Sequence, residues 1–142
     1  MTVNNKQRGF TLIEILIALV ILGIVMSVAL PGYQDSVRKS RRADAMRDLM
    51  ELGARQERFY AANSSYTTTV DTAAGLDLGR TTSAEGWYNL SIAACGGGSI
   101  ATCYVITASP TGAQLKDKGC LAMSLDNLGR RTSSGVLGND CW

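Results

Sequence analysis

The hydrophobic and polar positions divide the chain into parts with different periods. From Phe10 to Leu30 the sequence is an almost uninterrupted apolar run with one carboxylate, Glu14, near its start. As a helix this run would extend about 31 Å, which matches the hydrocarbon thickness of a bilayer. The pattern therefore predicts a membrane-length helix over residues 10–31 that carries one acidic side chain.

From Gly32 to Asn63, apolar residues recur at three- and four-residue steps, which predicts an amphipathic helix. The Arg38 to Arg42 cluster leaves three interpretations open: a solvated face, a contact with headgroups or neighbouring subunits, and a contact with DNA. The expected buried face is Val37, Met46, Leu49, Met50, Gly53 and Phe59 or Tyr60. The expected outer face is Arg38, Lys39, Arg41, Arg42, Arg47, Arg55 and Arg58 with Asp44, Asp48, Glu51 and Glu57.

The rest of the chain has no long period. Residues 64–86 are rich in Thr, Ser, Ala and Gly, which predicts a loop. Residues 87–142 contain short alternating runs, expected to form four strands at Tyr88–Ala93, Tyr104–Ala108, Leu121–Leu125 and Arg130–Ser133. The expected fold class is α+β, with a long N-terminal helix packed on an antiparallel sheet of about four strands.

The four cysteines all lie in the C-terminal third of the chain. None forms a C-x-x-C pair, so a zinc or redox site is not expected. An even cysteine count behind an export-type segment indicates disulfides and an oxidising compartment, and three pairings exist. We favour Cys95–Cys103 and Cys120–Cys141, because each bond would close one local loop.

Composition and charge narrow the function classes. The chain has 14 Lys and Arg against 12 Asp and Glu and contains no histidine. Without histidine, a serine or cysteine nucleophile would lack its usual activating base, so we expect no enzyme, no catalytic residue, no metal and no cofactor. The near balance of charge does not indicate a general nucleic-acid-binding protein.

Three interpretations compete for the N-terminal segment. A secretory signal would be cleaved after a site such as Ser27-Val28-Ala29, and a plain membrane anchor would explain the length but not Glu14. The third interpretation places cleavage between Gly9 and Phe10, which leaves the apolar helix on the mature chain. In each case Lys6 and Arg8 are expected to keep the N-terminus cytoplasmic.

The segment Gly9-Phe10-Thr11-Leu12-Ile13-Glu14 resembles the class III signal of type IV pilins and type II secretion pseudopilins. The resemblance implies a leader over residues 1–9, cleavage after Gly9 by a prepilin peptidase and N-methylation of Phe10. It also implies that Glu14 meets the N-terminal amine of a neighbouring subunit, which would offset the cost of a carboxylate in an apolar filament core. Residues 64–86 would then be the surface-exposed loop that joins the helix to the sheet.

Gly23 and Pro31 also match positions of the pilin family. Proline lacks a backbone N–H, and glycine weakens a helix by about 1 kcal/mol relative to alanine. We therefore predict a kink at Pro31. The resemblance to the pilin family implies that the helix can also unwind between Gly23 and Pro31 when the subunit assembles, because filaments of this family can melt the helix locally there.

The C-terminal part contains, in order, Ala108-Ser109-Pro110, Gln114, Lys116-Asp117, Cys120, the strand Leu121 to Asp126, Gly129, Arg131-Thr132 and Cys141-Trp142. This order resembles minor pilins of the PilE and ComP type, and members like ComP bind DNA for uptake. The leading hypothesis is a structural subunit of a type IV pilus, a minor rather than a major pilin, that supports adhesion, twitching motility or DNA uptake.

Two alternatives remain. In a DNA-binding competence pilin the candidate contacts are Lys116, Lys118, Arg130 and Arg131, with Arg80 more distant, and ordinary surface cations are the simpler interpretation. In a type II secretion pseudopilin, oxygen ligands for calcium could come from Asp126, Asn127, Asn139 and Asp140, although their spacing matches no known loop.

The expected partners and location follow from the pilin resemblance. The partners are other pilin subunits, the prepilin peptidase, the pilus assembly machinery of the inner membrane and, in the DNA-binding alternative, DNA. The expected location is the inner membrane before assembly, with the C-terminal domain in the periplasm, and then the extracellular pilus.

Overall fold

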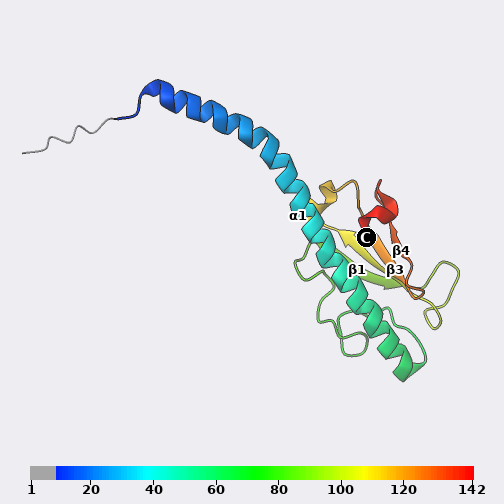
Figure 1. Cartoon of the computed structure of the whole chain (residues 1–142). Helices are drawn as coiled ribbons and strands as arrows, with labels where there is room; N and C mark the ends of the chain where they lie inside the picture. The colour runs from blue at the N-terminus through cyan, green and yellow to red at the C-terminus, as the bar shows by residue number, and fades with distance from the viewer. Residues whose placement is uncertain (1–8) are drawn as a thin grey trace, which may run out of the picture. The chain divides into compact units, whose positions relative to one another are not determined.

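The computed structural model describes residues 9–142, so the predicted leader lies outside the described residues except for Gly9. The chain divides into two compact units, one up to Val37 and the other from Arg38 to Trp142. The α+β fold class is confirmed. The elements are α1 (Leu12–Asn63), β1 (Tyr88–Ala93), β2 (Val105–Pro110), the 3₁₀ helix η1 (Gly112–Lys116), β3 (Met123–Asp126), β4 (Arg131–Ser133) and the 3₁₀ helix η2 (Gly138–Cys141), as Figure 1 shows.

Helix α1 is continuous through Gly23 and Pro31 in the first unit. Helical hydrogen bonding therefore persists on both sides of a residue that cannot donate to it. The kink at Pro31 and the unwinding on assembly stay predictions.

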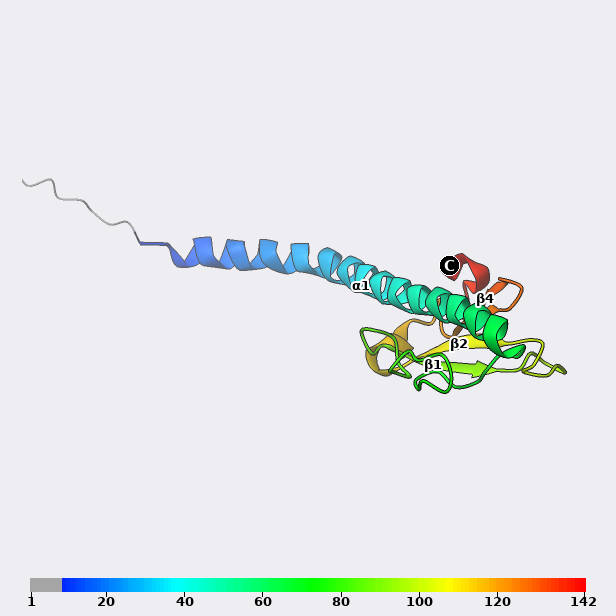
Figure 2. The same cartoon turned by 90° about the horizontal axis from the view of Figure 1, so that it is seen from below.

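The second unit contains one antiparallel sheet in the order β1-β2-β3-β4, visible from below in Figure 2. Tyr88 pairs with Pro110 and Ala93 with Val105, so β1 and β2 run side by side over their full lengths. Strands β3 and β4 are shorter and pair through Leu125 and Arg131. Each connection in the sheet joins neighbouring strands, which is a simple meander.

The part of α1 that belongs to the second unit packs on one face of the sheet (Figure 1). Ala45, Leu49 and Leu52 are completely buried and repeat at helical spacing. They share one hydrophobic core with residues such as Tyr88 and Ile106 from the sheet. The sheet side of this core follows the predicted alternation, since alternate residues of β1 are buried.

The predicted faces of this helix were wrong at four positions. Arg42, Asp44 and Asp48 were expected on the outer face but are buried, and Met50 was expected inside but is 45% exposed. Polar groups from other segments meet the three buried charges. Burial of a charge is tolerated when hydrogen-bonding partners of this kind are present.

The loop after α1 was expected to lie on the surface, which is wrong for part of it. Val70, Leu76 and Leu78 are buried in the common core. Asp48 fixes the far end of the loop, because it accepts hydrogen bonds from Arg80 (2.8 Å) and from the backbone N–H of Ala84 (2.9 Å). The loop is therefore a structural layer on the helix, although it has little regular secondary structure.

Two disulfides hold the sheet connections. Cys95–Cys103 closes the connection between β1 and β2, and Cys120–Cys141 joins the segment before β3 to η2. The paired Cα atoms are 5.7 and 5.6 Å apart. These bonds tie down the long connections around a small sheet. They stabilise the sheet mainly by constraining the unfolded chain.

Candidate functional site

The apolar part of α1 carries most of the exposed large hydrophobic side chains of residues 9–142. By length and composition it could cross a membrane, and none of its most hydrophobic window is buried. Contiguous apolar surface on this scale marks a site of membrane or protein contact.

Glu14 lies at the start of this helix and is engaged locally. It accepts hydrogen bonds from the backbone N–H of Thr11 (3.1 Å) and from the Thr11 hydroxyl (3.0 Å). Its own N–H donates to the Thr11 hydroxyl at 3.3 Å. This reciprocal arrangement is a capping box, whose T-x-x-E signal is present in the sequence and was missed. The assembly role of Glu14, together with those of Gly23 and Pro31, remains untested.

A buried polar network joins α1 to η1 and the sheet. Arg42 makes two hydrogen bonds to the carboxylate of Asp117, at 2.6 and 2.7 Å. The amide of Gln114 donates to Asp117 and to the phenol of Tyr88, both at 3.0 Å. Burial is the main reason that the pKa of Tyr88 is raised. Sequence spacing could not reveal this network, because Arg42 and Asp117 are 75 residues apart.

The four candidate DNA contacts are exposed but do not form one cluster. Lys116 is the last residue of η1, and Lys118 lies two residues further on, before the beginning of β3. Arg130 and Arg131 lie at the turn that follows the end of β3, so β3 separates the two pairs. Arg80, which was expected to be more distant, is held by the buried Asp48.

The β3–β4 turn is organised by one carboxylate. Asp126 accepts hydrogen bonds from the backbone N–H groups of Leu128 (3.0 Å) and Arg130 (2.9 Å), and its side chain pairs with the Arg130 guanidinium at 2.6 Å. Burial acts to raise the pKa of Asp126, but the hydrogen bonds and the charge of Arg130 outweigh it, so the pKa is lowered. Asp126 is thus occupied by its own turn rather than open to a cation.

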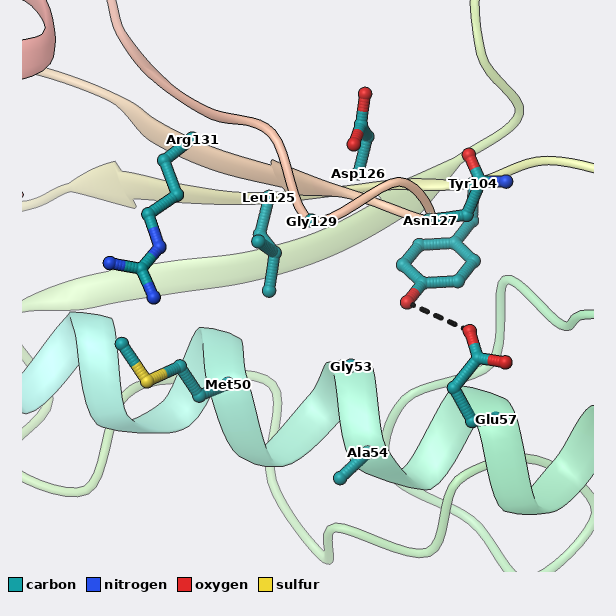
Figure 3. Close-up of a pocket in the computed structure, with 10 residues that line it drawn as sticks. All are labelled: Met50, Gly53, Ala54, Glu57, Tyr104, Leu125, Asp126, Asn127, Gly129 and Arg131. Carbon is teal, nitrogen blue, oxygen red and sulfur yellow. Dashed lines mark hydrogen bonds between the residues drawn. The ribbon is translucent and has the colours of Figure 1, made fainter.

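A shallow groove of about 330 Å³ lies between α1 and this turn. Figure 3 shows Arg131 at one end of its lining and Glu57 at the other. Tyr104 donates a hydrogen bond to Glu57 at 3.4 Å. Burial raises the pKa of Tyr104, and the negative charge of Glu57 raises it further. Leu125 fills the middle of the groove, where a Cβ on Gly53 would come within 3.3 Å of it.

A metal site does not emerge from the described part of the chain. Residues 9–142 contain no group of three or more His, Cys, Asp or Glu side chains placed to hold an ion. Of the four oxygen ligands considered for calcium, Asp126 ends β3 and Asn127 follows it in the β3–β4 turn, whereas Asn139 and Asp140 lie in η2.

Known proteins resemble this chain over most of its length. A family model described as "Type IV minor pilin ComP, DNA uptake sequence receptor" matches residues 31–124, more than half of the chain. The chain belongs to this family. A second model, the prokaryotic N-terminal methylation motif, matches residues 4–30 of the same pilin chain. The predicted resemblance to type IV pilins is confirmed.

Individual relatives match shorter segments of this pilin. A type II secretion system core protein G from Dickeya chrysanthemi is 35% identical over 66 residues, which cover 46% of this chain and 43% of that protein. A type IV major alpha-pilin from Moraxella bovis is 54% identical over 37 residues, which cover 26% of this chain and 23% of that protein. The matches to the secretion proteins thus span about half of their length, and the one to the Moraxella pilin spans less.

A solved type IV pilin structure from Shewanella oneidensis aligns with a TM-score of 0.49 at 22% identity, covering 74% of this chain and 97% of that one. A likeness at this level carries no argument. Membership of the pilin family therefore comes from the two family models, and the α+β architecture comes from the structure of the chain itself.

Proposed function

We propose that this chain is a minor subunit of a type IV pilus, anchored in the inner membrane by its apolar segment before assembly and packed through it in the fibre afterwards. One observation carries the proposal: an apolar helix with no covering surface is attached to a unit that has a complete core of its own. Such a helix gains by leaving water, at about 25 cal/mol for each Å² of apolar area. The role is structural, without enzymatic activity or a cofactor.

The N-terminal methylation motif supports the expected processing. A prepilin peptidase would cleave between Gly9 and Phe10 and methylate Phe10, and the assembly machinery of the inner membrane would then extract the subunit. The C-terminal unit would face the periplasm first and the outside of the cell in the fibre. Its disulfides suit both oxidising locations.

Incorporation into sheared fibres tests the proposal. Leu22 in the apolar segment and Leu115 in η1 are each about half exposed, so Leu22→Arg and Leu115→Arg add the same charge at positions of equal exposure. We expect L22R to be absent from fibres and L115R to be incorporated. Equal incorporation of both variants would contradict the proposal. Mass spectrometry of the fibres also measures abundance, and a fibre made mainly of this chain would contradict the minor role.

DNA capture is a second candidate function, because the matching family is described as a receptor for a DNA uptake sequence. The exposed cations would contact phosphates, so affinity should fall steeply with salt. Binding of the full-length chain to duplex DNA at two salt concentrations tests it. K116Q/K118Q and R130Q/R131Q remove the same charge from opposite ends of β3, so a loss in one variant assigns the contact. No binding at low salt would end this candidate.

A further inference from the structure

Two basic segments that are far apart in the sequence lie together where η1 meets α1 in the second unit. The amide of Gln114 in η1 donates to the backbone oxygen of Arg38 at 3.5 Å. Asp117, which directly follows η1, receives the two hydrogen bonds from Arg42. In both views η1 lies beside α1 (Figures 1 and 2). We call the resulting cluster the basic pole: Arg38, Lys39, Arg41, Arg42, Lys116 and Lys118.

The buried ion pair between Arg42 and Asp117 holds this pole together, and three of its cations, Lys39, Lys116 and Lys118, are exposed. Arg42 is matched by Asp117, whereas Lys116 and Lys118 flank that carboxylate in sequence and are exposed. The guanidinium of Arg41 lies 3.6 Å from the ring centroid of Trp87, a cation–π contact that does not neutralise it. The pole therefore combines several cations with one amphipathic aromatic ring.

Nearby carboxylates offset only part of this charge. Asp44 is buried and bonded to Arg47 and to the backbone N–H of Glu85, and Glu85 itself is exposed. Asp35 lies one turn before Arg38 and Lys39 on the continuous helix α1, so it offsets part of their charge. The cations of the pole thus outnumber the carboxylates around it.

The connectivity of the chain fixes how far the pole can be from the apolar segment. Arg38 follows Leu30 by eight residues, which cover about 12 Å as a helix. The headgroup layer adds roughly 5–7 Å on each side of the hydrocarbon, and charge interactions reach about 8 Å beyond it at physiological salt. Whatever the angle between the two units, Arg38 then stays within reach of the headgroups if the apolar segment spans a bilayer.

We propose that the basic pole docks on anionic phospholipid headgroups while the subunit waits in the membrane. This inference relies on the membrane anchoring in the proposed function. Lys and Arg are usually depleted on the exported side of a span, so a cluster in that position indicates a use for it there. Trp87 suits the same layer, because tryptophan prefers the boundary between lipid and water. Docking would hold the C-terminal unit close to the membrane until the subunit is extracted.

The test uses the full-length chain in lipid nanodiscs, made either of zwitterionic lipid alone or with about one third anionic phosphatidylglycerol. The chain has two tryptophans, so Trp142→Phe leaves Trp87 as the reporter. Fluorescence lifetimes of Trp87, with a quencher attached to the headgroups, give the ratio of docked to undocked protein. We expect docking in the anionic nanodiscs and its loss at high salt.

Matched variants identify the residues responsible. Each cation near an anionic surface contributes about fivefold, so K116Q/K118Q should lower the docked-to-undocked ratio about 25-fold. R58Q/R131Q removes the same charge from exposed positions outside the pole and should change the ratio less than twofold. Arg41 and Arg42 stay unchanged, which preserves the stacking on Trp87 and the buried ion pair.

Three outcomes would overturn the inference. The first is equal quenching of Trp87 in both lipid compositions, and the second is an equal effect of the two double variants on docking. The third is quenching that does not depend on the lipid, together with binding to duplex DNA that K116Q/K118Q abolishes. The last outcome would assign the pole to nucleic acid. Each of them leaves the proposed function intact, because the chain is still inserted in the nanodisc. A chain that cannot be recovered in nanodiscs at all would instead contradict the membrane anchoring.

Discussion

The two parts of α1 handle hydrophobic and charged residues in opposite ways. Up to Val37, large apolar side chains such as Leu19 are exposed, and Glu14 bonds only to the turn that it caps. From Arg38 onward the helix buries charges such as Asp48 as well as leucines, because loops and strands surround it. In one continuous helix, the part from Arg38 onward is packed against other segments of the chain, whereas the apolar side chains of the part up to Val37 are exposed.

The difference shows where the sequence is adapted to folding and where it is adapted to assembly. Buried polar groups are usually hydrogen-bonded, and the second unit supplies most of their partners from segments up to 76 residues away. The apolar side chains of the first unit need no fixed polar partners, since they can pack against lipid or against identical helices. Substitutions in the two parts should therefore affect different measurements.

The largest expected effect on stability comes from breaking the buried pair with Asp117→Ala. This variant leaves the Arg42 guanidinium buried without its carboxylate, which should cost about 3–5 kcal/mol of unfolding free energy. Urea denaturation of the full-length chain in micelles, followed by tryptophan fluorescence, measures the change. The double variant R42M/D117L should recover most of the loss, because it removes both charges. A loss below about 1 kcal/mol in D117A would show that the pair is not important for the fold.

Leucine truncation compares the two parts of the helix directly. Leu49→Ala removes a completely buried side chain and should cost about 2–5 kcal/mol in the same assay. Leu19→Ala in the apolar part should leave unfolding of the second unit unchanged and lower incorporation into fibres instead. If L19A destabilised the second unit as much as L49A, the distinction between the two parts would be wrong.

Much of the fold could be predicted because its signals are local. The apolar run, the alternation of Tyr88, Leu90 and Ile92 and the order of the strands all depend on neighbours in the sequence. The buried side of α1 could not be predicted, because Asp44 and Asp48 look like surface charges until the loop that binds them is in place. Loop residues such as Leu76 were missed for the same reason, since their burial depends on a distant helix.

The candidate site shows the same limit. The motif around Gly9 and Glu14 was visible in the sequence, and the family models match the chain there and beyond. The separation of Lys116 from Arg131 depends on the direction of β3, and the proximity of Lys116 to Arg38 depends on how η1 packs on α1. No spacing rule predicts either of these relationships.

The loss of stability at high pH provides a third comparison, between Tyr104 in the second unit and Tyr33 in the first. The pKa of Tyr104 is raised, so its phenol stays protonated in the folded state after it has ionised in the unfolded state. Stability should therefore fall as pH rises above about 10, by at most about 1.4 kcal/mol per pH unit for each such tyrosine. Denaturation at pH 8 and pH 11 should show a smaller fall in Tyr104→Phe.

Tyr33→Phe is the control for this measurement, because Tyr33 is 70% exposed and belongs to the first unit. The Y33F variant should follow the wild type at every pH. Tyr66 and Tyr88 also have raised pKa values, so Y104F should remove only part of the slope. An unchanged slope in Y104F would mean that Tyr104 does not stabilise the fold through its protonated form.

The smallest expected effect concerns the first turn of the helix. Glu14 caps this turn, and we propose that it also contacts a neighbouring subunit in the fibre. Thr11→Ala removes the hydroxyl that bonds to Glu14 and should cost about 1 kcal/mol locally, which raises amide exchange at the first turn about fivefold. Glu14→Gln keeps an acceptor that capping boxes tolerate, so its exchange should rise less. The same variant loses the charge that would pair with a neighbour's amine, and its incorporation into fibres should fall more than that of T11A. If incorporation instead followed the loss of capping in both variants, Glu14 would act by shaping its own helix rather than by contacting the next subunit.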